Sequence, residues 1–339
     1  MDKGPIYIGG LDRCGKTTMR AFLASHPHIA IPAVGSNMWT YFYGQYGNLA
    51  ESDNFERCLK ALLHYKHVRF LQPDPERIRH EFWQGPPTYA HLFSLFLIHY
   101  AEREGKPRWG AQTGLIERYA PLLFSAYPHL KIIHMVRDPR DRYEASLARW
   151  PDGKGRAGGA VARWRYSMRL AEHHIQQYPQ QYKIVSFEAM VTQPEETLHE
   201  FCDFLDENYI PDMLQMAGAP RHRERLLQDA PLPPGQSPVS PRYIGGFRGK
   251  IPPQEIAFMQ LHDGRKMECY GYQPDRLAFA AKDWLTFALT TWPSQAMRLT
   301  AWLTMELLQQ HLPRLVGRKP GQRMIIKEPF QPVERLETT

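Results

Sequence analysis

The chain of 339 residues is poor in cysteine and has no long apolar run, internal repeat or low-complexity tract. Cys14, Cys58, Cys202 and Cys269 are widely spaced and form no CxxC pair. This spacing excludes a disulfide scaffold and a cysteine zinc ribbon, and it is typical of a reducing compartment. No stretch approaches about 18 uncharged apolar residues, so no transmembrane helix is predicted. The first residues, MDKGPIYIGG, lack the pattern of a secretory signal. We therefore expect a cytoplasmic protein.

Composition and charge limit the classes of partner. Hydrophobic residues make up 43% of the chain and charged residues 23%, which is the balance of a globular protein with a substantial core. At roughly 150 residues per domain, the length suits one large α/β domain or two modest ones. The net charge of +7 favours an anionic partner. Charge alone leaves nucleic acid, an anionic membrane and a small polyanionic ligand as alternatives.

Short apolar runs alternate with helical patterns along most of the chain. Strands are predicted at 6–8, 29–31, 131–136 and 184–187. Helices are predicted after residue 15, at 55–66, 89–104 and 140–150, from the glycine-rich break at 153–159 to about 178, and from 194. At the last helix, Thr192-Gln193-Pro194-Glu195 predicts a start in which Thr192 caps and Glu195 reaches back. This alternation predicts an α/β fold with three layers: a central parallel sheet of P-loop NTPase-like architecture with helical additions.

The chain is divided into a main domain at 1–280, a C-terminal helical extension at 281–316 and a tail at 317–339, which we expect to be mobile. The aromatic segment 32–54 is a candidate pocket wall, and the segment 207–253, rich in Pro, Gly and Arg, is expected to form loops over the site. Residues 283–316, rich in Trp, Leu and Met, have two interpretations. They are either helices packed on the domain or on a second subunit, or an amphipathic helix at a membrane surface.

The sharpest local pattern is Gly10-Leu11-Asp12-Arg13-Cys14-Gly15-Lys16-Thr17, which matches GxxxxGK[ST] between a predicted strand and a predicted helix. Gly10 and Gly15 allow a tight turn whose backbone N–H groups approach a ligand, and the following helix adds its positive end. The alternative is a glycine-rich turn that binds nothing. Because strand, loop and helix are in register, we interpret the loop as an anion site. Lys16 supplies a point charge there, and Thr17 and Thr18 supply hydroxyls.

A second anion site is predicted after the strand at 131–136. Arg137 follows this strand directly, and Ser146 comes nine residues later, in the next predicted helix. A guanidinium can hold a phosphate with two hydrogen bonds and a hydroxyl can donate a third, so the pair suits a separate phosphate. A surface ion pair of Arg137 with Asp138 or Asp141 is an equally consistent alternative when this segment is considered alone.

Together these segments resemble the sulfotransferases that use 3′-phosphoadenosine 5′-phosphosulfate (PAPS). The resemblance covers about residues 5–272. Its further motifs are Trp109-Gly110-Ala111-Gln112-Thr113-Gly114, similar to WGxKTP; Phe187-Glu188-Ala189-Met190 with Pro194, similar to YEDL…P; and Tyr243-Ile244-Gly245-Gly246-Phe247-Arg248, similar to G-x-W-[RK]. It implies that the domain at 1–280 moves a sulfuryl group from PAPS to a hydroxyl or amine of an unidentified acceptor. A carbohydrate, a lipid or another small molecule is expected, and no metal is required.

The resemblance also assigns the contacts of the co-substrate. It implies that the loop takes the 5′-phosphosulfate, that Arg137 and Ser146 take the 3′-phosphate, and that Phe187 flanks the adenine. Arg242 and Arg248 are candidates in a loop that closes over the nucleotide. The implied cofactor-binding residues are Arg13, Cys14, Gly15, Lys16, Thr17, Thr18, Arg137, Ser146, Phe187, Arg242 and Arg248.

Sulfuryl transfer builds negative charge on the departing phosphate, so fixed cations and N–H donors are the main catalytic need. We predict that Arg13 and Lys16 meet this need.

The general base is less apparent, because the glutamate and the histidine of relatives are replaced here by Val34 and Gly114. We predict Asp12 as the base, followed by Glu117 and His134. The alternatives are that Asp12 caps the helix or pairs with Arg13, and that His134 is a structural histidine in a central strand.

Two other functions fit parts of the sequence. The loop GLDRCGKTT resembles that of thymidylate kinases, and Asp141-Arg142-Tyr143 with Ser146 resembles their DRY segment, which would imply a nucleoside triphosphate and magnesium. Asp138 is a candidate magnesium carboxylate, although Arg137 would compete for it. The other alternative is a non-catalytic nucleotide-binding module anchored at a membrane surface through 283–316. The expected partners are a small-molecule, glycan or lipid acceptor, a peripheral membrane and a second copy of the chain, but no nucleic acid.

Overall fold

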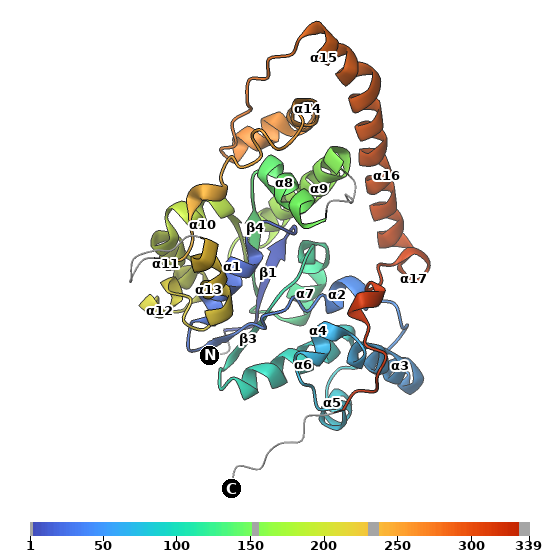
Figure 1. The fold of residues 1–339 in the computed structure, drawn as a ribbon. Coiled ribbons are helices and arrows are strands. Elements are labelled where there is room, and N and C mark those ends of the chain that lie inside the picture. The colour runs from blue at the N-terminus through green and yellow to red at the C-terminus, as the bar shows by residue number, and fades with distance from the viewer. Residues whose placement is uncertain (1–2, 151–155, 230–236, 332–339) are drawn as a thin grey trace.

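The computed structural model describes residues 3–150, 156–229 and 237–331. Five parallel strands form one sheet in the order β2-β3-β1-β4-β5 (Figure 1). The central strand β1 pairs on one side with β3, where Ile8 lies beside Gln112, and on the other with β4, where Gly10 lies beside Met135. The strands are β1 Ile6–Gly10, β2 Ile29–Ala30, β3 Arg108–Gln112, β4 Lys131–Val136 and β5 Tyr182–Ser186. The predicted α/β fold with a central parallel sheet is confirmed.

Helices cover the sheet and extend beyond it. They are α1 Lys16–Ala24, α2 Met38–Tyr41, α3 Ser52–Leu63, α4 Lys66–Arg69, α5 Pro75–Phe82, α6 Tyr89–Arg103, α7 Ala120–Ala126, α8 Pro139–Arg149, α9 Arg156–Gln177, α10 Phe187–Thr192, α11 Pro194–Leu205, α12 Pro211–Leu214, α13 Pro220–Asp229, α14 Pro253–Cys269, α15 Ala281–Thr286, α16 Trp292–His311 and α17 Pro313–Val316. Short 3₁₀ turns lie at η1 Ile116–Tyr119, η2 Pro241–Tyr243 and η4 Gln322–Met324, and the π-helical turn η3 Phe287–Thr291 joins α15 to α16. None of the described helices combines the length and the hydrophobicity that a bilayer crossing needs.

Separate hydrophobic cores lie on the two faces of the sheet. Successive side chains of a strand point to opposite faces. Ile6 and Ile8 therefore pack in one core with α1, α10 and α11, whereas Tyr7 packs in the other with α3 to α6. All three side chains are fully buried, which explains why β1 is a continuous apolar run without alternation.

The predicted start of α11 is wrong in its detail. Thr192 ends another helix, α10, and the N-cap of α11 is Gln193, which makes no side-chain cap hydrogen bond. Helix α10 begins immediately after β5 because the Ser186 hydroxyl accepts a hydrogen bond from the Ala189 N–H at 3.0 Å. This cap places Phe187 at the first position of α10, directly beside the carboxyl end of the sheet.

The aromatic segment at 32–54 belongs largely to the core. Trp39 and Phe42 are almost fully buried, and the Trp39 indole N–H donates to the Tyr7 hydroxyl at 3.1 Å. Trp39 also stacks on Tyr43, with the ring centroids 5.1 Å apart. These side chains therefore hold α2 against the sheet, and the proposed pocket wall is not found at Trp39 or Phe42.

The C-terminal extension lies along α9 at the edge of the molecule, and the chain then turns back toward α3 and α4 (Figure 1). The Gly158 N–H donates to Gln295 Oε1 at 2.9 Å, and a Cβ at Gly158 would overlap the backbone of Gln295, so the two helices touch closely there. In the tail, the Ile326 N–H donates to the His64 carbonyl at 2.9 Å, and Ile325 forms a β-bridge with Tyr65. The tail was expected to be mobile, yet it makes these contacts. Residues 332–339 lie outside the described residues.

Candidate active site

The phosphate loop joins β1 to α1 at the carboxyl edge of the sheet. Gly10 and Gly15 have φ angles of 93° and 89°, in the left-handed region that favours glycine. A Cβ at Gly15 would lie 2.7 Å from the Phe187 ring, so glycine also permits a close approach there. Arg13 has a φ of 66°, and its side chain is exposed. The backbone thus turns tightly where the sequence predicts an anion site.

The two residues that flank Gly15 differ in their access to a ligand. The Lys16 ammonium donates to the carbonyls of Gly10 and Leu11, at 2.8 and 2.5 Å. Burial lowers the Lys16 pKa. The Cys14 side chain is buried in the core, and burial raises its thiol pKa to about 11. Lys16 is therefore held at the loop by bonds that an anion can replace, whereas Cys14 has only its backbone to offer a ligand.

The hydroxyls that follow Lys16 have different surroundings. Thr17 is exposed at the start of α1. Thr18 is buried, and its hydroxyl lies 3.4 Å from Nε2 of His222 on α13. Burial lowers the pKa of His222 to about 4, with a further contribution from the charge of Arg225. Part of the segment at 207–253 therefore does pack next to the phosphate loop.

The second predicted anion cluster lies against the first. Arg137 donates from Nη1 to the Arg13 carbonyl at 3.2 Å and from Nη2 to the Tyr243 carbonyl at 2.9 Å. Its guanidinium lies over the Phe187 ring, 4.4 Å from the ring centroid. Burial and then the positive charge of Arg137 lower the Arg13 pKa. The structure thus brings Arg137, Phe187, Gly15 and the Arg13 backbone together, and the positive charge of Arg137 acts on the Arg13 guanidinium.

Ser146 and Asp12 meet on the other side of the loop. The Ser146 hydroxyl, on α8, lies 3.2 Å from Asp12 Oδ2 and 2.9 Å from the Arg142 carbonyl, and it can donate its single hydrogen to either. Arg142 donates from Nη2 to Asp12 at 2.8 Å. Burial alone would raise the Asp12 pKa, but the charges of Arg142 and Lys16 outweigh it and hold this pKa below its ordinary value. The partner of Asp12 is thus Arg142, whereas the sequence suggested Arg13, and Ser146 contacts the loop through Asp12.

A loop that follows η2 approaches the same edge of the sheet. Both oxygens of Asp141 accept backbone N–H groups from this loop, from Gly245 at 2.7 Å and from Phe247 at 3.0 Å. The Arg242 guanidinium lies over the ring of Tyr243, 4.6 Å from its centroid. Arg248, in contrast, makes a two-bonded ion pair with Asp275, at 2.8 and 2.7 Å. Asp141 therefore fixes the loop over the site, and Arg248 pairs with Asp275, a carboxylate that also lies 3.6 Å from Arg140.

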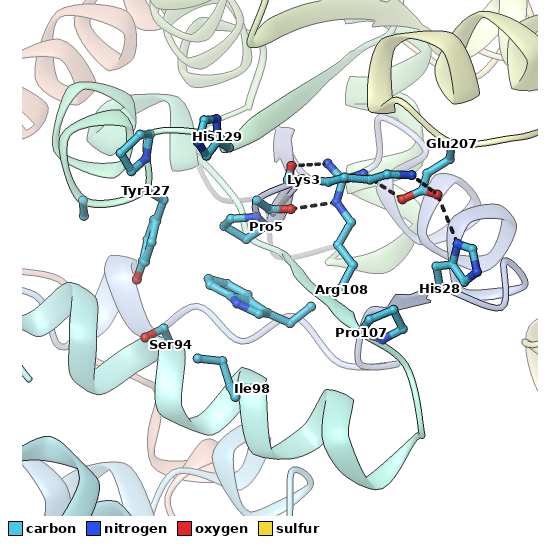
Figure 2. A pocket seen from close by; sticks show the side chains of 14 residues that line it. Lys3, Pro5, His28, Ser94, Ile98, Pro107, Arg108, Tyr127, His129 and Glu207 are labelled. Atoms are coloured by element: carbon cyan, nitrogen blue, oxygen red, sulfur yellow. Dashed lines mark hydrogen bonds and ion pairs between the residues drawn. The ribbon is translucent and has the colours of Figure 1, made fainter. Parts of the chain in front are cut away.

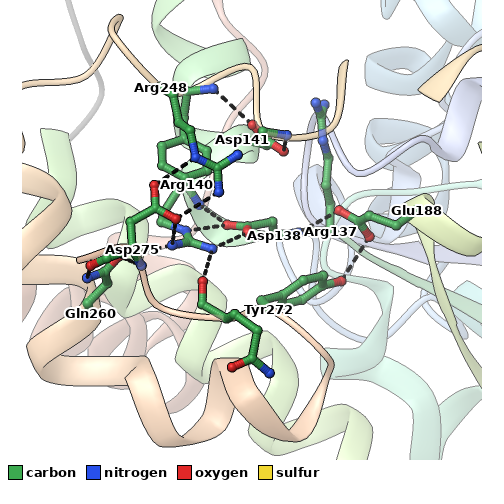
Figure 3. A network of polar contacts seen from close by, with 12 residues as sticks. Arg137, Asp138, Arg140, Asp141, Glu188, Arg248, Gln260, Tyr272 and Asp275 are labelled. Atoms are coloured by element: carbon green, nitrogen blue, oxygen red, sulfur yellow. Dashed lines mark hydrogen bonds and ion pairs between the residues drawn. The ribbon is translucent and has the colours of Figure 1, made fainter. Parts of the chain in front are cut away.

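Figure 3 shows Glu188 near Arg137, next to the ion pairs of Asp138 and Asp275. Glu188 accepts from the Asp138 N–H and from the Tyr272 hydroxyl, each at 3.0 Å. Both oxygens of Asp138 are taken by Arg140, at 3.0 and 2.7 Å. Sequence reasoning named Arg137 as the competitor for Asp138, but Arg140 holds that carboxylate. This two-bonded ion pair occupies the oxygens that a magnesium ion at Asp138 would need.

The other two candidate bases lie beneath the phosphate loop. Glu117, on η1, is fully buried; its carboxylate accepts from the Gly10 N–H at 3.3 Å and from the Ser167 hydroxyl. His134, on β4, is also fully buried, with Nδ1 2.8 Å from the Tyr182 hydroxyl, and burial lowers its pKa. Both residues support the loop from below. Their role as bases stays a prediction, as does that of Asp12.

A cavity lies away from this site, at the amino edge of the sheet (Figure 2). It has a volume of about 580 Å³ and is lined by Lys3, His28, Arg108, Tyr127 and Glu207, among others. Glu207 accepts from Lys3 at 2.9 Å and from Arg108 at 3.1 Å, so its carboxylate is already neutralised. At the same edge, among the residues that the structure describes, the side chains of His26, His28 and Glu207 lie close enough together to bind one metal ion. Neither feature touches the phosphate loop.

Comparison with known proteins agrees with this geometry. Residues 5–211 match the model of the Sulfotransferase family. The chain belongs to this family. It is 22% identical over 264 residues to a protein-tyrosine sulfotransferase of Drosophila melanogaster, across 73% of this chain and 48% of the fly protein, so it spans about half the length of that relative. The sulfotransferase domain of the Synechococcus PCC 7002 olefin synthase aligns with a TM-score of 0.51 and 20% identity, over 79% of this chain and 94% of that domain, which supports the fold alone.

Several contacts of this site were not predicted from the sequence. Asp141 was considered as an ion-pair partner of Arg137 and, with Arg142, for a likeness to kinases, yet Asp141 holds the η2 loop and Arg142 holds Asp12. The backbone carbonyl of Tyr243 is a partner of Arg137 that no residue type could indicate. Asp141 directly precedes Arg142 in the chain, so residue type gave no signal that the partner of Arg142 would be Asp12.

Proposed function

We propose that this protein is a sulfotransferase that moves a sulfuryl group from PAPS to a hydroxyl or amine of its acceptor. The observation that carries the proposal is the contact of Arg137 with the Arg13 carbonyl, which brings the two predicted anion sites together. A nucleotide with phosphates at both its 3′ and 5′ positions needs two separate anion sites at one adenosine. A nucleoside triphosphate, by contrast, concentrates its phosphates at a single loop.

The residues around Arg137 suit such a nucleotide. Arg137 Nε is buried and has no hydrogen-bond partner among the described residues, so one donor is left for a ligand oxygen. Phe187 presents a ring beside Gly15, where a base or sugar can lie against it. The Arg13 and Arg137 charges repel each other, and a phosphate between them would relieve that repulsion. These features support Arg137 and Phe187 as nucleotide contacts.

In the proposed reaction the bond between sulfur and the 5′-phosphate oxygen breaks, and a bond forms between sulfur and the acceptor oxygen or nitrogen. Negative charge then grows on the departing phosphate. Lys16 can leave the Gly10 and Leu11 carbonyls and donate to that oxygen, while Arg13 and the N–H groups at the start of α1 add positive potential. We propose that these donors suffice without a metal ion.

The acceptor loses a proton in this step. Asp12 lies beside the loop, but the charges of Arg142 and Lys16 make its carboxylate a weak proton acceptor. At the two positions where relatives have a base, Val34 is partly exposed, and the backbone of Gly114 accepts a hydrogen bond from the Thr40 hydroxyl at 3.2 Å. We therefore propose that orientation and charge stabilisation contribute most, with the proton passing to solvent or to Asp12.

The test is calorimetric titration with adenosine 3′,5′-bisphosphate and with ATP, each with and without magnesium, followed by a transfer assay with ³⁵S-labelled PAPS and a panel of hydroxyl and amine acceptors. We expect metal-independent binding of the bisphosphate and transfer of label. Magnesium-dependent binding of ATP in preference to the bisphosphate would support a kinase and refute the proposal. Tight bisphosphate binding without transfer to any acceptor would favour the non-catalytic module.

A further inference from the structure

The outer side of the C-terminal extension is an uncovered apolar face. Helix α15, the turn η3 and helix α16 form one continuous helical arm, in which α16 packs along α9 and η3 contacts α14. On the outer side, exposed residues recur at intervals of three or four, so each lies next to the previous one on the helix surface. We call this set the outer stripe: Leu285, Leu289, Pro293, Met297, Ala301, Met305, Leu308 and Leu312. Trp284 and Trp292, also exposed, lie beside its first half.

The chain that forms and follows the outer stripe is mainly basic. Between residues 284 and 327 the chain has six lysines and arginines but one acidic residue, Glu306. Glu306 is buried and paired with Arg118 and Arg318. The exposed lysines and arginines, by contrast, include Arg314, Lys319, Arg323 and Lys327, which follow the stripe in the chain. The extension therefore combines an uncharged outer face with a basic C-terminal end.

We propose that the outer stripe is a docking surface for an anionic lipid bilayer. An interfacial helix inserts its apolar side chains between head groups, and neighbouring cations attract anionic lipids. Tryptophan is favoured at that depth because its ring is apolar with one polar N–H. A second copy of the chain is the competing occupant. Pairing two such extensions would bring like charges together, with no exposed carboxylate between residues 284 and 327 to pair with them.

The dimensions of the arm suit this use. From Ala281 to His311 the chain is helical throughout, and at 1.5 Å per residue the arm is about 45 Å long. Figure 1 shows the arm along one edge of the molecule, and no other element that the structure describes covers the side of α16 that faces away from α9. The arm can therefore lie along a membrane surface without unfolding from the domain. This inference does not depend on the reaction proposed above.

The test is sedimentation of the full chain with vesicles of phosphatidylcholine alone and of phosphatidylcholine containing about one third phosphatidylserine. We expect binding to the anionic vesicles that weakens with added salt, and a partition coefficient about tenfold or more lower for neutral vesicles. Equal binding to both vesicles, or no binding to the anionic ones, would overturn the proposal.

A matched pair of double variants separates the stripe from general surface effects. Leu289→Glu with Met297→Glu changes two stripe residues, each 67% exposed. Leu122→Glu with Leu261→Glu makes the same change of charge on α7 and α14, where the side chains are 45% and 65% exposed. We expect the first pair to lower binding to anionic vesicles by about tenfold or more and the second to leave it within about twofold. Equal effects of the two pairs would overturn the proposal.

Two further measurements complete the test. Lys319→Gln, Arg323→Gln and Lys327→Gln together leave the helical arm unchanged, and we expect them to reduce binding to anionic vesicles and its dependence on salt. Unchanged binding would contradict the electrostatic part of the proposal. Analytical ultracentrifugation without lipid tests whether a second copy of the chain binds the outer stripe. A wild-type dimer that the stripe variant converts to a monomer would assign the surface to a second copy and overturn the lipid assignment.

Discussion

Replacement of Arg137 by alanine is the sharpest test of the nucleotide site. In the structure this guanidinium donates to the carbonyls of Arg13 and Tyr243 and lies over the Phe187 ring. It is 7% exposed. If it binds the 3′-phosphate, Arg137→Ala removes a fork of charged hydrogen bonds from the complex. The same change also leaves two carbonyls of the free protein without their donor.

The expected magnitude follows from these contacts. Hydrogen bonds to charged groups contribute about 1.5–3 kcal/mol each. In the variant, water can donate to the phosphate in place of the lost guanidinium, which reduces the net loss of binding free energy. We expect a loss of about 2–3 kcal/mol of binding free energy, which raises the dissociation constant of adenosine 3′,5′-bisphosphate by about 30- to 150-fold. Arg137→Lys keeps the charge but loses the fork, so its effect should be intermediate.

Calorimetric titration with the bisphosphate measures this loss, and thermal unfolding checks that each variant is folded at the temperature of the titration. Arg165→Ala is the matched control, because it removes an arginine whose ion pair is with Asp263 on α14, at 2.8 Å. We expect the control to change the dissociation constant by less than about twofold. A folded Arg137→Ala protein that binds the bisphosphate as tightly as the wild type would refute the assignment of Arg137 to the 3′-phosphate.

Three further predictions address the loop, its pH dependence and the extension. Lys16→Ala should lower the turnover rate by about 10²- to 10³-fold, which is typical for the loss of one preorganised donor, and should change bisphosphate affinity less. A variant that loses affinity but keeps its turnover rate would contradict the role of Lys16 at the leaving oxygen. The pKa of His222 is lowered to about 4 in the folded protein. As the pH drops, the unfolded chain therefore takes up a proton on this imidazole before the folded protein does, and the free energy of unfolding should fall between about pH 6.5 and 4. Thermal unfolding of His222→Gln should show a flatter profile in that window, and an unchanged profile would contradict the assignment. Glu306→Gln leaves Arg118 and Arg318 without their buried counter-charge and should cost about 3–5 kcal/mol in urea unfolding, whereas Glu172→Gln, at a more exposed ion pair with Lys266, should cost less than about 1 kcal/mol.

Local sequence patterns were sufficient for the elements that position the site. The run at 131–136 coincides with β4, because a strand buried on both faces is continuously apolar. The glycines of the phosphate loop indicated its turn correctly, since Gly10 and Gly15 both adopt positive φ angles. The family motifs then led to Arg137 and Phe187, which the structure places together.

Pairings between distant residues were not accessible in the same way. Asp12 and Arg142 are 130 positions apart, and nothing in either segment distinguishes this partner from the adjacent Arg13. Aromatic content likewise did not reveal that Trp39 would be buried beneath the sheet, because a tryptophan suits a core and a pocket wall equally. In each case the fold decides which of several chemically equivalent partners is near.

The structure also bears on the boundary predicted between the main domain and the extension. Two consecutive residues of η1 face in opposite directions: Glu117 accepts the Gly10 N–H of the phosphate loop, and Arg118 makes an ion pair with Glu306 on α16. Because Glu117 and Arg118 share one short turn, neither contact can shift far without disturbing the other. Removal of α16 would also leave Arg118 buried without its carboxylate, a costly state for a charge. The extension therefore packs against the same short turn that supports the phosphate loop, so the predicted boundary at 280 separates segments that share a buried ion pair.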